Sequence, residues 1–348
     1  MEPSPNDLRA GLVDWQRAAR IAGRLAKPGP TAERGQLESL VDELRDAAGR
    51  AAGHVATITQ LEAQDGTDPK DVSNVLVVDR PRWAQANAEM FGVMTGGVDV
   101  PAGQAARAAG AVQVGGVLAL LSTKVLGQFD PFTPQDTFHG RLLLVAPNVL
   151  HHERKLKVDS SDFRLWVALH EQTHAMQFAA APWLAEHVRS RAAELLGDLT
   201  GEGARSDLLG SVTRALSDGG GGILEALSPE QRTVFEEVGA VMAVLEGHAD
   251  VTMDEVGPSV VPTVRSIRKA FEARRDQASK GRGLDQVLRR LLGLDAKLAQ
   301  YRDGAKFVRE VRSSVGTSGF NAVFATAENL PLPREIADPR AWVRRVHG

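Results

Sequence analysis

The chain has 348 residues, with 41 Lys and Arg against 44 Asp and Glu and a formal net charge of −3. Its apolar share of 43% can form the core of one large domain or two medium ones, and its charged share of 24% excludes wholesale disorder. The near balance of charges argues against a general nucleic-acid binder. Cysteine is absent, which excludes disulfides, thiolate catalysis and cysteine-ligated metal sites.

The N-terminal third predicts helices around one strand. Apolar and charged residues alternate at helical spacing over 7–26 and 31–53, on either side of the breaker Pro28-Gly29-Pro30. The β-branched run 75–79 favours a strand, and 81–91 has the pattern of a helix.

An uncharged stretch, Ala108 to Thr123, is the best candidate for a membrane span. It has 16 residues and is rich in Ala and Gly, whereas a span needs about 20 strongly apolar residues. We therefore predict a buried core helix here. The N-terminus lacks the pattern of a secretory signal, so we expect a cytoplasmic protein without a membrane partner.

The remainder is mostly helical. Its two prolines make 128–134 a predicted loop, and Arg141 to Ala146 is the second strand candidate. A helix begins near Ser160 and ends at Pro182. The segment Ser228-Pro-Glu-Gln has the form of an N-cap, a first-turn proline and a capping-box glutamine, so it predicts a helix from Ser228 to about Val256.

No linker separates two different compositions, and this favours one α-rich domain over 1–348 with a minor β-sheet. Within it we expect an N-terminal helical part, 1–135, and a part that carries the metal site, 136–348.

The chemistry is concentrated in the motif H-E-x-x-H, formed by His170, Glu171 and His174. Two histidines at i and i+4 share one helix face and can bind one Zn²⁺, and the Glu after the first is placed to take a proton from a metal-bound water. The helix is apolar nearly all round, which predicts a buried position. Two core histidines satisfied by hydrogen bonds are the alternative.

A catalytic zinc site has three protein ligands, and without cysteine the third is His, Asp or Glu. The strongest candidate is Glu246, with Asp250 one turn further on the same helix face. Asp250 can then receive a hydrogen bond from a ligating histidine and fix its tautomer. His248 points about 200° away from Glu246 around the helix, so the two cannot share one metal. A solvated acidic helix end, with His248 as ligand or none, stays open.

These motifs resemble the zincin metallopeptidases, and among them the gluzincins, in which H-E-x-x-H is followed on a second helix by E-x-x-x-D. The resemblance implies that His170, His174 and Glu246 ligate one Zn²⁺, that Glu171 is the general base, and that Asp250 orients a ligating histidine.

The chain is also similar, nearly end to end, to a bacterial family of zincin-like hydrolases, some members of which are associated with deazaflavin-cofactor biosynthesis. The stretches that carry this similarity, besides the two metal helices, are Asp14-Trp15, 78–80 with Trp83, 125–131, 143–148 and 300–304.

Three features depart from other zincins. The 72-residue separation of His174 and Glu246 is longer than in thermolysin-type enzymes, and no H-x-x-G-x-x-H continuation of the metzincin kind follows His174. The edge strand that would bind an extended peptide is also not obvious from the sequence, and Arg141 to Ala146 is the only decent candidate before the metal helix.

Hydrolysis also needs a donor to the developing oxyanion. Tyr301, the single tyrosine, is the candidate, and an amphipathic helix surface residue is the alternative. His248 and Arg302 are lesser candidates.

The predicted function is zinc-dependent hydrolysis of a peptide or amide bond, with Glu171 as base. Two alternatives remain: hydrolysis of a small non-peptide metabolite, and a catalytically inactive zincin scaffold that serves stability or protein interaction. Nine basic residues between Arg265 and Arg290 are predicted to be a solvated helix face, so no nucleic-acid partner is expected.

Overall fold

The computed structural model describes residues 13–96, 103–198, 228–280 and 294–348. They are mainly helical with a small sheet, as predicted. The chain divides into two compact units. The first unit comprises Met1–Ala185 and Val256–Val264, and the second comprises Glu186–Glu255 and Arg265–Gly348. The expected subdivision at 135/136 falls inside the first unit, and the single domain stays a prediction.

The sheet of the first unit has three strands in the order β1-β3-β2, namely β1 (Ser73–Val78), β3 (Gly140–Val145) and β2 (Gly127–Asp130). β1 pairs with β3 in parallel and β2 pairs with β3 in antiparallel orientation. The two predicted strands are confirmed.

The loop predicted over 128–134 is wrong at its start, because β2 continues to Asp130. The prolines that suggested a loop, Pro131 and Pro134, follow the strand. Arg141 to Ala146 is also not an edge strand: β3 is central and buried throughout, and Ala146 already begins a helix. The antiparallel edge strand is β2.

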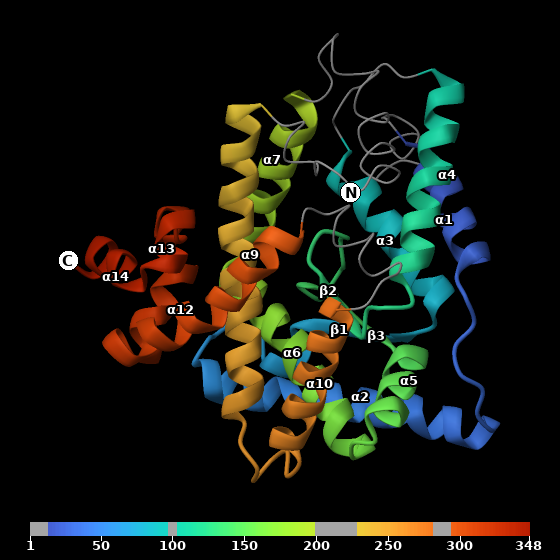
Figure 1. The fold of residues 1–348 in the computed structure, drawn as a ribbon, viewed down its shortest axis with the longest axis horizontal. Coiled ribbons are helices and arrows are strands. Elements are labelled where there is room, and N and C mark those ends of the chain that lie inside the picture. The colour runs from blue at the N-terminus through green and yellow to red at the C-terminus, as the bar shows by residue number, and fades with distance from the viewer. Residues whose placement is uncertain (1–12, 97–102, 199–227, 281–293) are drawn as a thin grey trace. The chain divides into compact units, whose positions relative to one another are not determined.

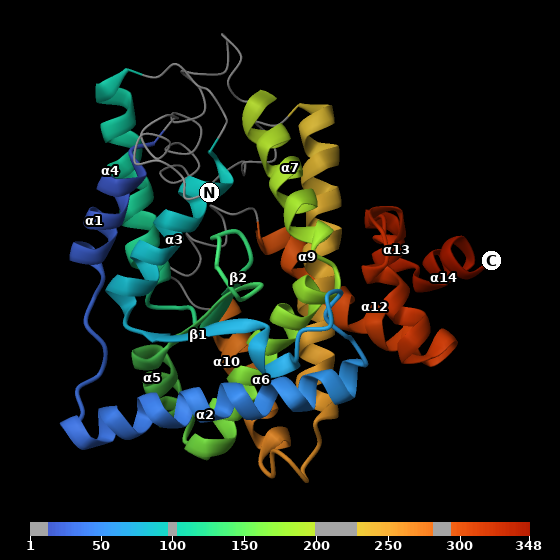
Figure 2. The same cartoon turned by 180° about the vertical axis from the view of Figure 1, so that it is seen from behind.

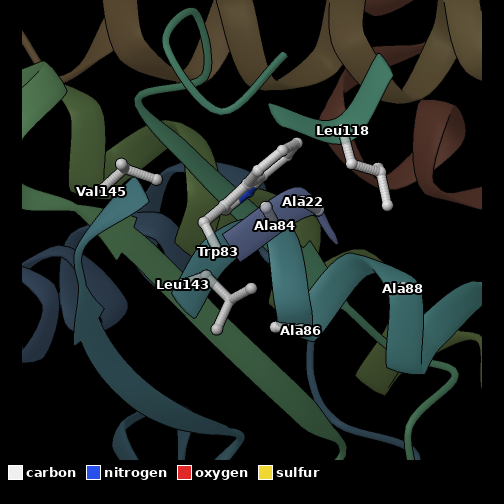
Figure 3. Close-up of a cluster of buried hydrophobic side chains, with 8 residues drawn as sticks. All are labelled: Ala22, Trp83, Ala84, Ala86, Ala88, Leu118, Leu143 and Val145. Carbon is white, nitrogen blue, oxygen red and sulfur yellow. The ribbon is translucent and has the colours of Figure 1, made fainter. Parts of the chain in front are cut away.

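Six helices surround this sheet. Figures 1 and 2 show α1, α3 and α4 over one face and α2 and α6 against the other. The cluster of buried side chains in Figure 3 joins α1, α3 and α4 to β3 through Ala22, Trp83, Leu118 and Leu143. The helices are α1 (Trp15–Leu25), α2 (Arg34–Thr59), α3 (Arg80–Met94), α4 (Gln104–Leu121), α5 (Ala146–Leu156) and α6 (Ser160–Ala180), with a short 3₁₀ turn at Pro69–Asp71.

The predicted core helix at 108–123 is a helix, α4, but only one side of it is buried. Val112 is 51% exposed and Val117 is 38% exposed, because α4 packs on one side only. By length and composition α4 is the one described helix that could cross a membrane. A single helix of this kind is weak evidence for a membrane span.

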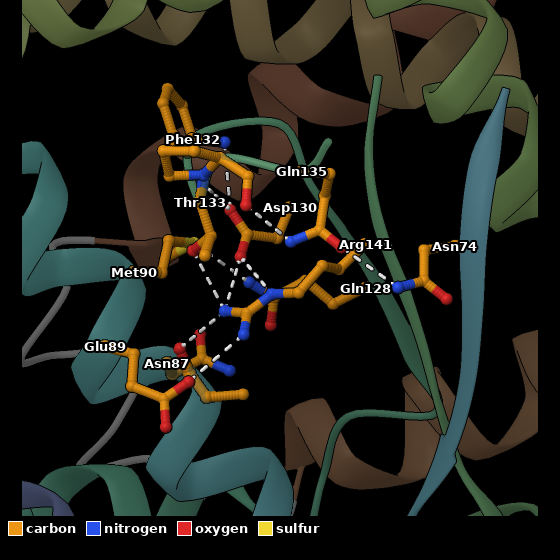
Figure 4. Close-up of polar contacts among 12 residues, drawn as sticks. Asn74, Asn87, Glu89, Met90, Gln128, Asp130, Phe132, Thr133, Gln135 and Arg141 are labelled. Carbon is orange, nitrogen blue, oxygen red and sulfur yellow. Dashed lines mark hydrogen bonds and ion pairs between the residues drawn. The ribbon is translucent and has the colours of Figure 1, made fainter. Parts of the chain in front are cut away.

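A buried ion pair fixes the end of β2 (Figure 4). The Arg141 guanidinium donates to Asp130 Oδ2 at 2.8 and 3.0 Å, to Glu89 Oε2 at 3.1 Å and to the Thr133 hydroxyl at 2.9 Å. Arg141 and Asp130 are both buried. Because a buried charge is tolerated only when it is paired, this cluster ties β2 to β3 and α3.

The second unit is helical. Its long helix α9 begins with the predicted capping box, since Gln231 N donates to Ser228 Oγ at 3.2 Å and Ser228 N donates to Gln231 Oε1 at 2.9 Å. Helices of this unit or entering it are α7 (Trp183–Asp198), α9 (Pro229–Glu255), α10 (Val264–Lys280), α12 (Leu294–Phe320), α13 (Pro333–Ala337) and α14 (Pro339–His347), with 3₁₀ turns at Asn321–Phe324 and Ala327–Asn329.

Backbone contact sets the distance between α9 and α12. A Cβ atom on Gly247 would lie 2.2 Å from the Gly304 carbonyl carbon, and one on Gly304 would lie 1.9 Å from Ala243 O. Only glycine fits at both positions. The pair therefore fixes α12 against the turn of α9 that carries Glu246.

Candidate metal centre

Helix α6 carries the H-E-x-x-H motif and is central, as predicted. It begins after Asp159, whose side chain accepts a hydrogen bond from Asp162 N at 2.9 Å. Fourteen of its 21 residues are buried. A helix covered on most sides holds its side chains in fixed rotamers, which is what a metal or catalytic site requires.

Polar contacts lock α6 to its neighbours. Gln172 donates to Ala48 O of α2 at 3.1 Å and accepts from the Ser73 hydroxyl of β1 at 3.1 Å. Arg164 pairs with Glu153 of α5 at 2.8 Å and with Glu43 of α2. Burial lowers the pKa of the Arg164 guanidinium, but its contacts with both carboxylates outweigh burial and raise that pKa. Arg164 therefore stays charged and keeps α6 in place.

The two histidines of the motif face each other. The Nε2 atoms of His170 and His174 are 3.2 Å apart, and their ring planes meet at 84°. Two nitrogens on one tetrahedral zinc are about 3.3 Å apart, since Zn–N bonds measure about 2.0–2.1 Å. The imidazole pair therefore fits a single zinc ion.

Gln177 fixes the orientation of His174. Its Oε1 lies 2.9 Å from His174 Nδ1, and its side chain is fully buried. If the amide oxygen faces the ring, as the contact requires, Nδ1 carries the proton and the lone pair of Nε2 points toward His170. The sequence motifs gave Gln177 no role, although it lies one helical turn after His174. Its i+3 spacing from His174 was the available signal.

Replacing Gln177 should therefore weaken zinc binding. We expect Gln177→Leu to lower zinc affinity about 10–100-fold, because a ligating histidine loses the acceptor that fixes its tautomer. Competition with a chelator measures this affinity. Gln177→Glu is the matched control, since it keeps the acceptor and should bind zinc at least as tightly. Equal affinities in the wild type and Gln177→Leu would exclude the orienting role.

Glu171 lies against the backbone of the edge strand. It is 6% exposed, and a Cβ atom on Gly127 would lie 2.6 Å from Glu171 Cγ and 2.8 Å from Oε1. A residue other than glycine at the start of β2 would displace this carboxyl group. Sequence reasoning missed Gly127 because the contact joins residues far apart in the chain.

His170, His174 and Glu246 are a set of side chains that could hold one metal ion; the two histidines lie on α6 of the first unit and Glu246 lies on α9 of the second. Two nitrogens and one carboxylate oxygen are a donor set that suits zinc and leaves a fourth position open. The individual ligand roles stay predictions.

The neighbours of Glu246 on α9 have other contacts. His248 is fully buried, with its ring centroid 4.9 Å from that of Phe320 and 5.7 Å from that of Phe324, which is the setting of a core residue. The Asp250 carboxylate lies 3.5 Å from Arg268 Nη1. Its predicted bond to a ligating histidine stays a prediction.

Two other predictions concern residues only partly described. Tyr301 lies in α12, but its side chain is outside the described residues, so its role toward an oxyanion stays a prediction. In the basic segment 265–290, Arg268 is half-buried and pairs with Asp254 at 2.8 Å, while 281–290 are outside the described residues.

The profile of the zincin-like metallopeptidases matches residues 13–343. The chain belongs to this family. It is also similar to the crystal structure of a candidate hydrolase with a novel fold from Chloroflexus aurantiacus, with 29% sequence identity and a TM-score of 0.67 over 97% of this chain and 99% of that one. No curated protein matches the chain.

These relationships confirm the zincin-like resemblance and support a zinc hydrolase. The association with deazaflavin-cofactor biosynthesis stays a prediction.

Proposed function

We propose that the protein is a zinc metallopeptidase that cleaves peptide or amide bonds in the cytoplasm. The observation that carries this proposal is the facing pair of His170 and His174 Nε2 atoms, 3.2 Å apart, with the buried carboxyl group of Glu171 beside it. The family match supports the same chemistry.

In this proposal His170, His174 and Glu246 hold one zinc ion. Zinc, when bound, supplies a water with a pKa of about 7 and a Lewis acid for the scissile carbonyl. Gln177 would hold the His174 ring so that its Nε2 lone pair is free to bind the metal, and Asp250 is proposed to orient a ligating histidine.

Glu171 moves the protons. Its carboxylate takes a proton from the attacking water and later delivers it to the leaving amine. The Gly127 backbone lies against this carboxyl group and restricts its rotation, so the base is held in one place. Tyr301 is proposed to donate a hydrogen bond to the oxyanion.

The position of β2 favours a peptide over a small metabolite. β2 pairs with β3 alone among the described strands, so its outer side is a sheet edge. An extended peptide can add to such an edge through backbone hydrogen bonds. Because Gly127 of β2 touches Glu171, a peptide on this edge would pass the base.

The test uses the full chain as purified. Metal analysis should give one zinc per chain, and a mixture of unstructured peptides should be cleaved at internal bonds. Phenanthroline should stop cleavage, and added Zn²⁺ should restore it. If the zinc-loaded protein cleaves none of the peptides, the peptidase proposal is rejected. The two alternatives would then be hydrolysis of a small metabolite and a catalytically inactive zincin scaffold.

A further inference from the structure

Helices α1 and α4 lie side by side and run in the same direction in the first unit (Figures 1 and 2). Near their starts, Asp14 N donates to Arg107 O at 3.4 Å. Further along, a Cβ atom on Gly115 would lie 2.8 Å from Ile21 Cγ2 and 3.0 Å from Ala18 O. The two helices therefore form a closely packed pair.

Helix α3 covers one side of this pair. Gly23 of α1 lies against Gln85 of α3, and Leu118 of α4 shares a buried cluster with Trp83 (Figure 3). The positions of α1 and α4 that point away from α3 are the exposed ones, so both helices present an outer side in the same direction.

The outer side of α4 is uncharged and mostly apolar. Ala109, Val112, Gln113 and Val117 are exposed along it, and no charged residue occurs from Ala108 to Thr123. A surface helix normally directs charged residues to solvent, whereas α4 directs valine, alanine and one glutamine. These exposed residues explain why α4 is not the fully buried helix that the sequence predicted.

The outer side of α1 is basic. Arg17, Arg20 and Arg24 are exposed at i, i+3 and i+7, and Lys27 follows the helix. None of the four forms an ion pair with a described residue. Leu25, which is 58% exposed, adds an apolar side chain next to them.

The two segments are strongly basic in a chain with a net charge of −3. Residues 13–27 and 103–124 contain six basic residues and one acidic residue, Asp14. Asp14 caps α1 by accepting a hydrogen bond from Arg17 N at 2.9 Å, so its charge is engaged at the helix N-terminus.

We propose that this α1–α4 face, formed by Arg17, Arg20, Arg24, Ala109, Val112 and Val117, binds an anionic membrane surface. Peripheral binding needs an apolar strip that enters the headgroup region and basic side chains that attract anionic lipids, and this face has both. This proposal differs from the expectation that the protein has no membrane partner. That expectation was based on segments that could span the bilayer and did not concern binding to its surface.

The experiment is co-sedimentation of the purified full chain with vesicles of phosphatidylcholine and phosphatidylglycerol in a ratio of about 2:1. The chain should bind these vesicles, bind them less at high salt, and not bind phosphatidylcholine alone. The triple change Arg17→Gln, Arg20→Gln, Arg24→Gln should weaken binding about 100-fold, or roughly fivefold per charge.

The matched control is Arg34→Gln, Arg45→Gln, Arg50→Gln, which removes three exposed charges from α2 of the same unit. It should change vesicle binding by less than about twofold, because those charges do not lie on the proposed face. Equal losses in the two variants would show general charge attraction and overturn the proposal. So would equal binding of the wild type to neutral and anionic vesicles.

A label tests the apolar strip. Because the chain lacks cysteine, Val112→Cys takes a single environment-sensitive fluorophore, with Leu37→Cys on α2 as control. Anionic vesicles should shift the emission of the label at 112 to shorter wavelength and leave that at 37 unchanged. A shift at 112 that depends on protein concentration without vesicles would mean that a second copy covers the face, which contradicts the proposal.

Discussion

Replacing Glu171 by glutamine is expected to leave zinc bound and to slow peptide cleavage by about 10²–10⁴-fold. Glutamine has the size of glutamate, so the carboxamide fits the space beside Gly127 that the carboxyl group occupies. It cannot take a proton from the attacking water. The metal ligands are untouched, so the loss should appear in turnover.

Zinc content and turnover are measured on the same preparation, with Glu62→Gln as the control. Glu62 is exposed in the same unit, and its replacement removes the same charge without touching the motif. Loss of zinc in Glu171→Gln would show that Glu171 supports the metal site. Unchanged turnover would remove it from the mechanism.

The features that the sequence predicted correctly depend on short-range spacing. The i, i+4 spacing of His170 and His174 places both rings on one face of α6, and the capping box at Ser228 starts α9 at the expected residue. In both cases the interacting residues lie within two turns of one helix, where the backbone geometry is fixed.

The features that it missed depend on contacts between distant segments. β2 is a strand because β3 pairs with it and Arg141 fixes Asp130, whereas its local signal was dominated by the prolines that follow. Gly127 gains its role only from the approach of α6. The exposure of α4 depends on which side α1 covers, and composition alone cannot give this.

Replacing His174 by alanine is expected to lower zinc content well below one ion per chain and to lower thermal stability with it. A metal that binds only the folded state stabilises it by about 4 kcal/mol when free zinc is 1,000-fold above Kd. A chelator should therefore lower the melting temperature of the wild type and leave that of His174→Ala nearly unchanged. Glu246→Gln should give the same result if Glu246 is the third ligand.

The control on α9 is Glu236→Gln, because Glu236 is exposed on the same helix and its replacement removes the same charge. This variant should keep its zinc and its response to the chelator. If Glu246→Gln also kept both, the third ligand would be another residue. His248 is a poor substitute, since its ring is buried between Phe320 and Phe324 and would have to leave that core to reach a metal. Loss of stability in Glu246→Gln with zinc retained would instead assign Glu246 to the packing of α9.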